Sequence, residues 1–233
     1  MAARETEFSS AVEDYAKAIY ALQEGDGTVG VTAIAHRLNV TPASASGMVR
    51  KLDELGLVTH ERYRGVRLTD AGTRLALEML RHHRLLELFL AQSLGVPWDR
   101  VHQEAEVLEH VLSDELEALI AAKLGNPTHD PHGDPIPSAD LVMAEEVSEC
   151  LTQLEPGAEA VVVRISDAEP EMLRYLAARE IVPGTRLRVV DKQPFGGPLF
   201  VEVAGETYAL GGQLATSMRV RSAALMRPPG EAR

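Results

Sequence analysis

Several residue types are scarce in this 233-residue chain, and each scarcity excludes a class of protein. The only cysteine is Cys150, so no intrachain disulfide can form, which is typical of a reducing cytoplasm. Aromatic residues make up 4% of the chain, so its cores should consist mainly of Leu, Val and Ala. Even the apolar stretch 85–96 carries Glu87 and is too short to cross a membrane. The first seven residues lack the apolar run of a secretory signal, and we expect a cytoplasmic protein.

The net charge of −12 disfavours nucleic acid binding until its distribution along the chain is considered. Residues 31–74 hold seven basic and four acidic groups, a net charge of +3. The remaining residues hold 16 basic and 31 acidic groups, a net charge of −15. A locally basic module on an acidic body can bind DNA while the body limits non-specific association. The same acidic body attracts cations.

The first third of the chain predicts three helices followed by a β-hairpin, the order of a winged helix-turn-helix. These elements are expected over residues 12–22, 31–38, 42–55 and 57–69. Apolar residues recur at helical spacing in the first segments, and Val49, Leu52 and Leu55 are expected to face inward. Thr41 suits the N-cap of the third helix, and Pro42 suits its first position.

The third helix is expected to present small and polar side chains to a DNA major groove. Basic residues after this face and on the wing suit phosphates. The candidate DNA-contacting residues are Thr41, Pro42, Ser44, Ala45, Ser46, Met48, Arg50, Lys51, Arg62 and Arg64. The alternative is a winged helix that contacts only proteins.

The pentapeptide Glu106-Val107-Leu108-Glu109-His110 is the most informative stretch of the sequence. It lies in residues 102–114, which contain neither Gly nor Pro and predict a helix. Glu106, Glu109 and His110 then share one face, where two carboxylates and an imidazole repel or desolvate one another without a cation. Oxygen-rich ligand sets with one or two nitrogens suit Mn²⁺ or Fe²⁺. A solvated acidic face beside a surface histidine would give the same pattern.

A series of motifs in this order resembles the diphtheria toxin repressor family of metal-dependent transcriptional repressors. The motifs lie at residues 12–20, 31–56, 63–69, 82–87, 102–115 and 130–137. The resemblance covers residues 8–140 and, more weakly, the last third of the chain. It implies a homodimer with a winged helix, a helical dimerisation domain and two neighbouring metal sites, bound to a palindromic operator.

The resemblance implies a first metal site formed by Asp14, Glu106, Glu109 and His110. Iron-responsive members carry Met and Cys where this chain has Asp14 and Glu106, whereas manganese-responsive members carry Asp and Glu. Carboxylates are harder ligands than thioether or thiolate, so Mn²⁺ is favoured over Fe²⁺. One manganese branch carries a further carboxylate where this chain has Lys17, so we expect a single ion here rather than a manganese pair.

The second site implied by the resemblance is centred on His83, Glu87 and His102. His83 and Glu87 are four residues apart on one predicted helix face, and the neighbouring His82 is expected at the surface. Further candidate ligands are Asp130, His132, Asp167 and Glu171. Each of these four could also be an ordinary exposed side chain.

The last third of the chain predicts short strands separated by Gly-rich turns, a pattern typical of a small β-barrel. Strands are expected over residues 160–165, 187–190, 199–203, 206–210 and 218–220, with a helix over 170–179. This part resembles the SH3-like (FeoA-type) domain found in longer family members. The fold class is therefore mainly α with β, with domains expected at 1–75, 76–147 and 148–228.

Together these features predict a dimeric Mn²⁺- or Fe²⁺-dependent repressor of metal-uptake genes, with two metal sites per chain and no enzymatic or membrane role. A carboxylate-bridged di-metal enzyme such as a ferroxidase is one rival, but it would need Glu-x-x-His sets on facing helices, and only one acidic cluster is evident. A winged-helix repressor that senses a non-metal ligand is the other.

Overall fold

The computed structural model describes residues 8–23, 27–61 and 64–222, which divide into two units. The first unit comprises Met1–His83, Glu106–Ala118 and Pro137–Met143, and the second comprises Arg84–Ala105, Leu119–Ile136 and Ala144–Arg233. The long helix α4 (Asp70–Leu94) contributes residues to both units. Among the described residues, no helix is long and apolar enough to span a bilayer.

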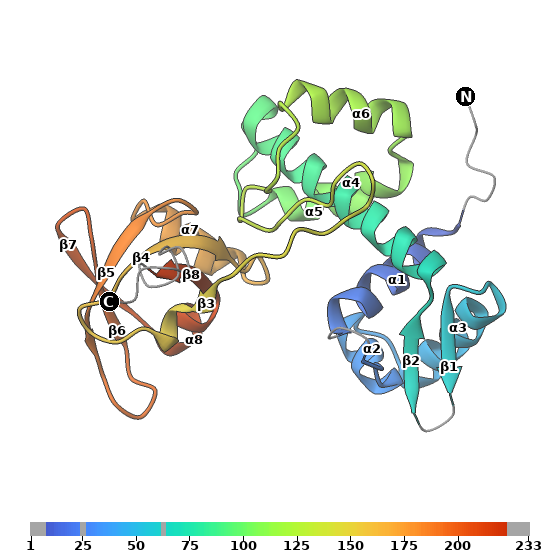
Figure 1. Cartoon of the computed structure of the whole chain (residues 1–233), viewed down its shortest axis with the longest axis horizontal. Coiled ribbons are helices and arrows are strands. Elements are labelled where there is room, and N and C mark those ends of the chain that lie inside the picture. The colour runs from blue at the N-terminus through green and yellow to red at the C-terminus, as the bar shows by residue number, and fades with distance from the viewer. Residues whose placement is uncertain (1–7, 24–26, 62–63, 223–233) are drawn as a thin grey trace, which may run out of the picture. The chain divides into compact units, whose positions relative to one another are not determined.

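The winged helix-turn-helix predicted for the first unit is confirmed (Figure 1). Its elements are α1 (Ser10–Leu22), α2 (Val31–Arg37), α3 (Pro42–Glu54), β1 (Val58–Glu61) and β2 (Gly65–Leu68). The Thr41 hydroxyl accepts a hydrogen bond from the backbone N–H of Ser44 at 3.2 Å, and Pro42 occupies the first turn of α3. The two strands pair antiparallel, with Val58 opposite Leu68.

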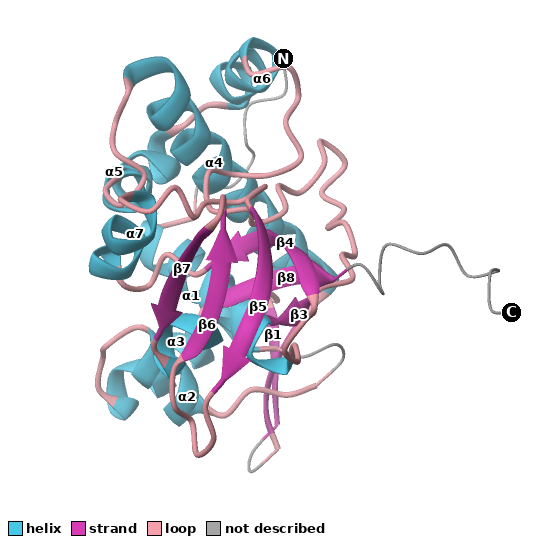
Figure 2. Cartoon of the chain, turned by 90° about the vertical axis from the view of Figure 1, so that its left-hand side faces the viewer, coloured by secondary structure: helices cyan, strands magenta, loops and turns pink. Residues whose placement is uncertain are grey.

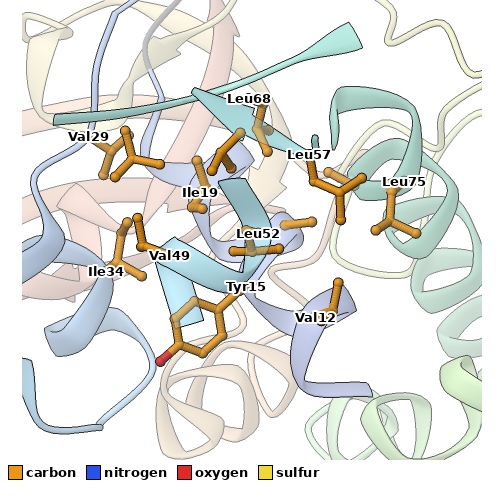
Figure 3. Packing of buried hydrophobic residues seen from close by; sticks show 14 of the residues in the cluster. Val12, Tyr15, Ile19, Val29, Ile34, Val49, Leu52, Leu57, Leu68 and Leu75 are labelled. Carbon is orange, nitrogen blue, oxygen red and sulfur yellow. The ribbon is translucent and has the colours of Figure 1, made fainter. Parts of the chain in front are cut away.

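The core of this module is mainly aliphatic, and side chains from α1, α2, α3 and the wing meet in it (Figure 3). Ile19, Val49 and Leu52 are completely buried. Two expectations about α3 were wrong. Ala45 is also completely buried, because it lies one turn before Val49 on the same helix face. Leu55 is 44% exposed, because it caps the helix after the last regular turn instead of facing the core.

The continuous helix predicted over residues 102–114 was wrong, because the structure breaks it into three elements. These are α5 (Val101–Leu108), the 3₁₀ turn η1 (Glu109–Val111) and α6 (Asp114–Lys123). Ser113 causes the break, since its hydroxyl accepts from the backbone N–H of Leu116 and starts a new helix. Glu109 and His110 therefore lie on a tight turn.

The second unit contains a six-stranded antiparallel sheet in the order β3-β8-β4-β5-β6-β7 (Figure 2). The strands are β3 (Glu149–Cys150), β4 (Glu159–Ile165), β5 (Arg186–Lys192), β6 (Leu199–Val203), β7 (Glu206–Leu210) and β8 (Met218–Ser222). The short helices are η2 (Leu151–Gln153), α7 (Pro170–Ala177) and α8 (Gly212–Thr216). Each strand and the helix predicted for this part of the chain is present. Alternating apolar residues of the strands form its core, against which Trp98 packs.

Candidate metal centres and DNA-binding surface

The first candidate centre lies in the first unit, where α1 meets η1. Asp14 of α1 and Glu109 and His110 of η1 each offer one ligand atom, and these atoms lie within 4.8 Å of one another. Oδ1 of Asp14 is buried without a hydrogen-bond partner in the described part of the chain, although Nε2 of His110 is 3.2 Å away. A buried lone pair without a donor is costly, so this arrangement fits a cation.

Glu13 orients the imidazole of His110, a role that the sequence did not reveal. Nδ1 of His110 lies 2.6 Å from Oε2 of Glu13, so the ring donates its N–H there. Nε2 then faces Oδ1 of Asp14 at 3.2 Å. A carboxylate that fixes the tautomer of a histidine in this way is the usual partner of a metal-ligating imidazole. Glu13 is only 3% exposed. Its position beside Val12, on the apolar face of α1, was the feature of the sequence that could have indicated a buried functional carboxylate.

Glu109 is completely buried and is contacted by two basic side chains. Its Oε2 lies 2.5 Å from Nδ1 of His83, and its Oε1 lies 2.5 Å from Nζ of Lys17. Lys17 also donates to Oε1 of Glu106 at 2.9 Å. Burial opposes the charge on Lys17, but Glu109 and Glu106 outweigh this effect and raise its pKa. The ammonium group of Lys17 therefore lies between Glu106 and Glu109 and neutralises part of their negative charge, as a bound cation would.

Asp14 shows the electrostatic cost of this cluster. Burial, together with the nearby charges of Glu106 and Glu109, raises the pKa of Asp14 despite the opposing effect of His110 and Lys17. The side chain of the predicted ligand Glu106 is 41% exposed, and its Oε1 lies 2.9 Å from Lys17 and 4.0 Å from His83. The structure therefore groups Asp14, Glu109 and His110 most tightly.

The second candidate centre lies in the second unit and joins α4 to the segment after β4. Glu87, His132 and Asp167 offer ligand atoms within 4.8 Å of one another. His102 is adjacent, with Nδ1 3.3 Å from Glu87 and 2.9 Å from Asp167. Hydrogen bonds that the ring of His102 donates to Asp167 and then to Glu87 raise its pKa to about 10. Nδ1 of His102 thus links Glu87 to Asp167 in the second centre.

His132 is positioned by a loop that is anchored to the sheet. Its Nε2 donates to the backbone oxygen of Trp98 at 2.8 Å, and the two rings stack. Nδ1 is buried and has no hydrogen-bond partner within the described ranges, with Oε2 of Glu87 3.8 Å away. Gly133 has φ +89°, and a Cβ there would lie 1.9 Å from the backbone oxygen of Val163, so only glycine allows this approach.

Other predicted ligands occupy different surroundings. Asp130 is buried, and its Oδ1 accepts from the backbone N–H groups of His132 and Asp134, which shapes the loop. The side chain of Glu171 is 91% exposed and lies 3.9 Å from Arg174. His83 belongs to the first unit, where it contacts Glu109. The expectation that His82 is a surface residue was wrong, since it is completely buried.

The candidate DNA-binding surface is only partly as expected. Exposed residues on or beside α3 are Thr41, Pro42, Ser44, Ser46, Arg50 and Lys51. Met48 is half-buried against the core, and Ala45 is enclosed by it, so Ala45 cannot touch a base edge. On the wing, Arg64 is exposed and pairs with Glu61 at 3.0 Å. Arg62 lies outside the described residues.

A winged helix joined to carboxylate and imidazole clusters defines a class of metal-responsive DNA-binding proteins. Comparison with known families supports this conclusion along most of the chain. Residues 7–66 match the iron dependent repressor N-terminal DNA binding domain, and residues 69–138 match the iron dependent repressor metal binding and dimerisation domain. Residues 150–222 match the FeoA domain.

Full-length relatives identify the family. The chain is 32% identical over 226 residues to the iron-dependent repressor IdeR of Mycobacterium tuberculosis, covering 92% of this chain and 98% of that protein. It is 29% identical to the diphtheria toxin repressor of Corynebacterium diphtheriae, covering 89% of this chain and 95% of that protein. The chain belongs to the diphtheria toxin repressor family of metal-dependent transcriptional repressors.

Solved structures add manganese-responsive neighbours. A manganese-dependent transcriptional repressor in complex with manganese is 46% identical, with a TM-score of 0.84, over 91% of this chain and 99% of that one. The manganese regulator SloR is 31% identical, with a TM-score of 0.73, over 90% of this chain and 97% of that one.

Proposed function

We propose that the protein is a homodimeric repressor that Mn²⁺, or alternatively Fe²⁺, activates to bind a palindromic operator and silence metal-uptake genes. One observation carries this proposal. Asp14 lies on α1 of the DNA-binding module, and its proposed partner ligands Glu109 and His110 lie on η1 of the region that matches the dimerisation domain. A cation held there would link the two parts of the chain.

The donor atoms favour a hard divalent cation. Asp14, Glu109 and His110 provide carboxylate oxygen and imidazole nitrogen, with Glu106 as a further carboxylate beside them. None of the predicted ligands is a sulfur residue, and the only cysteine belongs to β3 of the other unit. Carboxylates suit Mn²⁺ better than softer ions, with Fe²⁺ next. The bound ion would supply the positive charge that lets the carboxylates remain ionised and close together.

The chain's own residues then determine the position of α3, the proposed DNA recognition helix. Asp14 repels Glu106 and Glu109 when all three are charged, and Lys17 offsets only part of this repulsion. When Asp14 is held against His110 and Glu109, α1 is fixed relative to η1, and α3 is fixed through the core that it shares with α1. A dimer with two fixed recognition helices matches two half-sites of a palindrome. Metal would thus favour one member of an existing set of conformations.

The second centre would strengthen this arrangement without contacting DNA. Glu87, His102, His132 and Asp167 would join the FeoA-matching part to α4 and α5 within the second unit. An ion that binds only the folded state stabilises it by mass action. We therefore propose two ions in these centres per chain, one of them needed for DNA binding.

Footprinting on a duplex selected from a random library in the presence of Mn²⁺ tests the function. Protection should appear with Mn²⁺ or Fe²⁺ and disappear in excess chelator. His110→Ala should lose protection, whereas His129→Ala should retain it, because His129 pairs with Glu146 outside both centres. Full protection in excess chelator would overturn the proposal.

A further inference from the structure

A third cluster of acidic and imidazole groups lies in the first unit, apart from both centres described above. Glu78 and His82 are one turn apart on α4, and Asp114 is the first residue of α6. Their ligand atoms lie within 4.8 Å of one another. Glu117 is nearby, with Oε2 3.2 Å from Nε2 of His82, and its other oxygen accepts from Arg81 at 2.7 Å.

His82 points an unsatisfied nitrogen into this cluster. The side chain is completely buried, and Nδ1 lies 3.3 Å from the backbone oxygen of Glu109. A carbonyl oxygen can only accept, so the ring N–H belongs on Nδ1 and the lone pair on Nε2. Nε2 is buried and has no hydrogen-bond partner among the residues that the structure describes, although Oε2 of Glu117 lies 3.2 Å away. A buried lone pair that faces carboxylate oxygens is unfavourable without a cation.

We propose that Glu78, His82 and Asp114 form a third divalent-metal site. Two carboxylates and one imidazole are a ligand set for Mn²⁺, Fe²⁺ or Zn²⁺. Asp114 is exposed, so the site is open to exchange with solvent, whereas His82 forms its buried wall. The backbone oxygen of Glu109 fixes the ring orientation of His82, in the same way that backbone carbonyls orient metal-ligating histidines in other proteins.

The same hydrogen bond gives the third site a regulatory consequence. Glu109, whose carbonyl holds His82, supplies its side chain to the first centre. Metal at the third site would therefore immobilise η1 and help to hold Glu109 and His110 for the first ion. This coupling depends on the proposed function, whereas binding at the third site does not. Coupling between such sites typically changes an affinity by about 5-fold to 150-fold.

Equilibrium dialysis of the full chain against Mn²⁺ tests the site, with the number of bound ions per chain as the readout. His82→Asn keeps an amide N–H toward the Glu109 carbonyl but removes Nε2. Asp114→Asn removes one exposed carboxylate without endangering the fold. Glu115→Gln, on the exposed neighbour of Asp114, is the matched control.

At a free Mn²⁺ concentration that saturates the unmodified protein, both cluster variants should bind about one ion fewer per chain, and the control should bind the full number. Operator binding by His82→Asn should still depend on Mn²⁺ but should require a higher concentration. If Asp114→Asn and His82→Asn both retain the full ion count, the third site does not exist. This readout is independent of DNA binding, so its failure would leave the repressor function untouched.

Discussion

The ammonium nitrogen of Lys17 lies 2.5 Å from Oε1 of Glu109, a carboxylate that no solvent reaches. The same nitrogen lies 2.9 Å from Glu106. Lys17 thus places a fixed positive charge beside the ligands of the first centre. A second ion in the same place would have to displace it, so this centre should hold one ion.

Lys17→Glu should therefore convert the first centre into a site for two ions. The substitution removes the competing charge and adds a carboxylate one turn after Asp14. We expect about one additional Mn²⁺ per chain in calorimetric titration. Lys123→Glu, at the end of α6, makes the same charge change away from the centre and should bind the same number as the unmodified chain. An unchanged count in Lys17→Glu would show that the lysine does not limit occupancy.

The hardness of the ligands should set metal selectivity. The double variant Asp14→Met, Glu106→Cys introduces a thioether and a thiolate, which favour softer ions. Operator binding should lose Mn²⁺ activation more than Fe²⁺ or Co²⁺ activation, measured as the metal concentration for half-maximal binding. Equal losses for the three ions would mean that these positions do not determine selectivity.

The wing should contribute to DNA affinity without determining sequence preference. Arg64→Ala should weaken binding to all duplexes and reduce the slope of log K against log salt by about 0.9, the value for one phosphate contact. Ser44→Ala or Ser46→Ala, on the exposed face of α3, should instead change sequence preference. A salt slope that is unaltered in Arg64→Ala would place the wing outside the interface.

The second centre should stabilise the protein without being essential for DNA binding. Asp167→Asn removes a carboxylate that contacts His102 and should weaken Mn²⁺ at this centre by roughly tenfold or more, since even outer partners of a metal ligand contribute about that much. The rise in melting temperature on adding Mn²⁺ should shrink accordingly. Glu171→Gln, on an exposed side chain of the same domain, should behave like the unmodified chain. An identical rise in Asp167→Asn would exclude Asp167 as a ligand.

Local sequence signals were sufficient for most of the fold. Thr41 predicted the N-cap of α3, and Pro42, whose ring fixes φ, predicted its first turn. The structure has both residues in these positions. The break between η1 and α6 was missed because Ser113 was not treated as the start of a new helix. Ala45 was misplaced because a small residue gives a weak periodic signal, although it lies one turn before Val49.

The ligand clusters depended on contacts between distant segments, which periodicity cannot locate. Their spacing on one helix suggested that His83 and Glu87 bind the same ion. In the structure His83 contacts Glu109, whereas Glu87 lies with His132 and Asp167. For the same reason Glu13 was overlooked and His82 was wrongly expected at the surface. Both are charged or polar residues whose burial becomes apparent only when the facing segment is known.

The most direct test of the central claim is the ratio of operator affinity with and without Mn²⁺, measured by fluorescence anisotropy for the unmodified chain and for Asp14→Asn. Coupling through the first centre predicts a ratio on the order of 100-fold for the unmodified chain. In Asp14→Asn the ratio should fall close to one, because α1 no longer supplies a charged ligand. The same large ratio in both proteins would contradict the account, as would undiminished affinity of the unmodified chain in excess chelator.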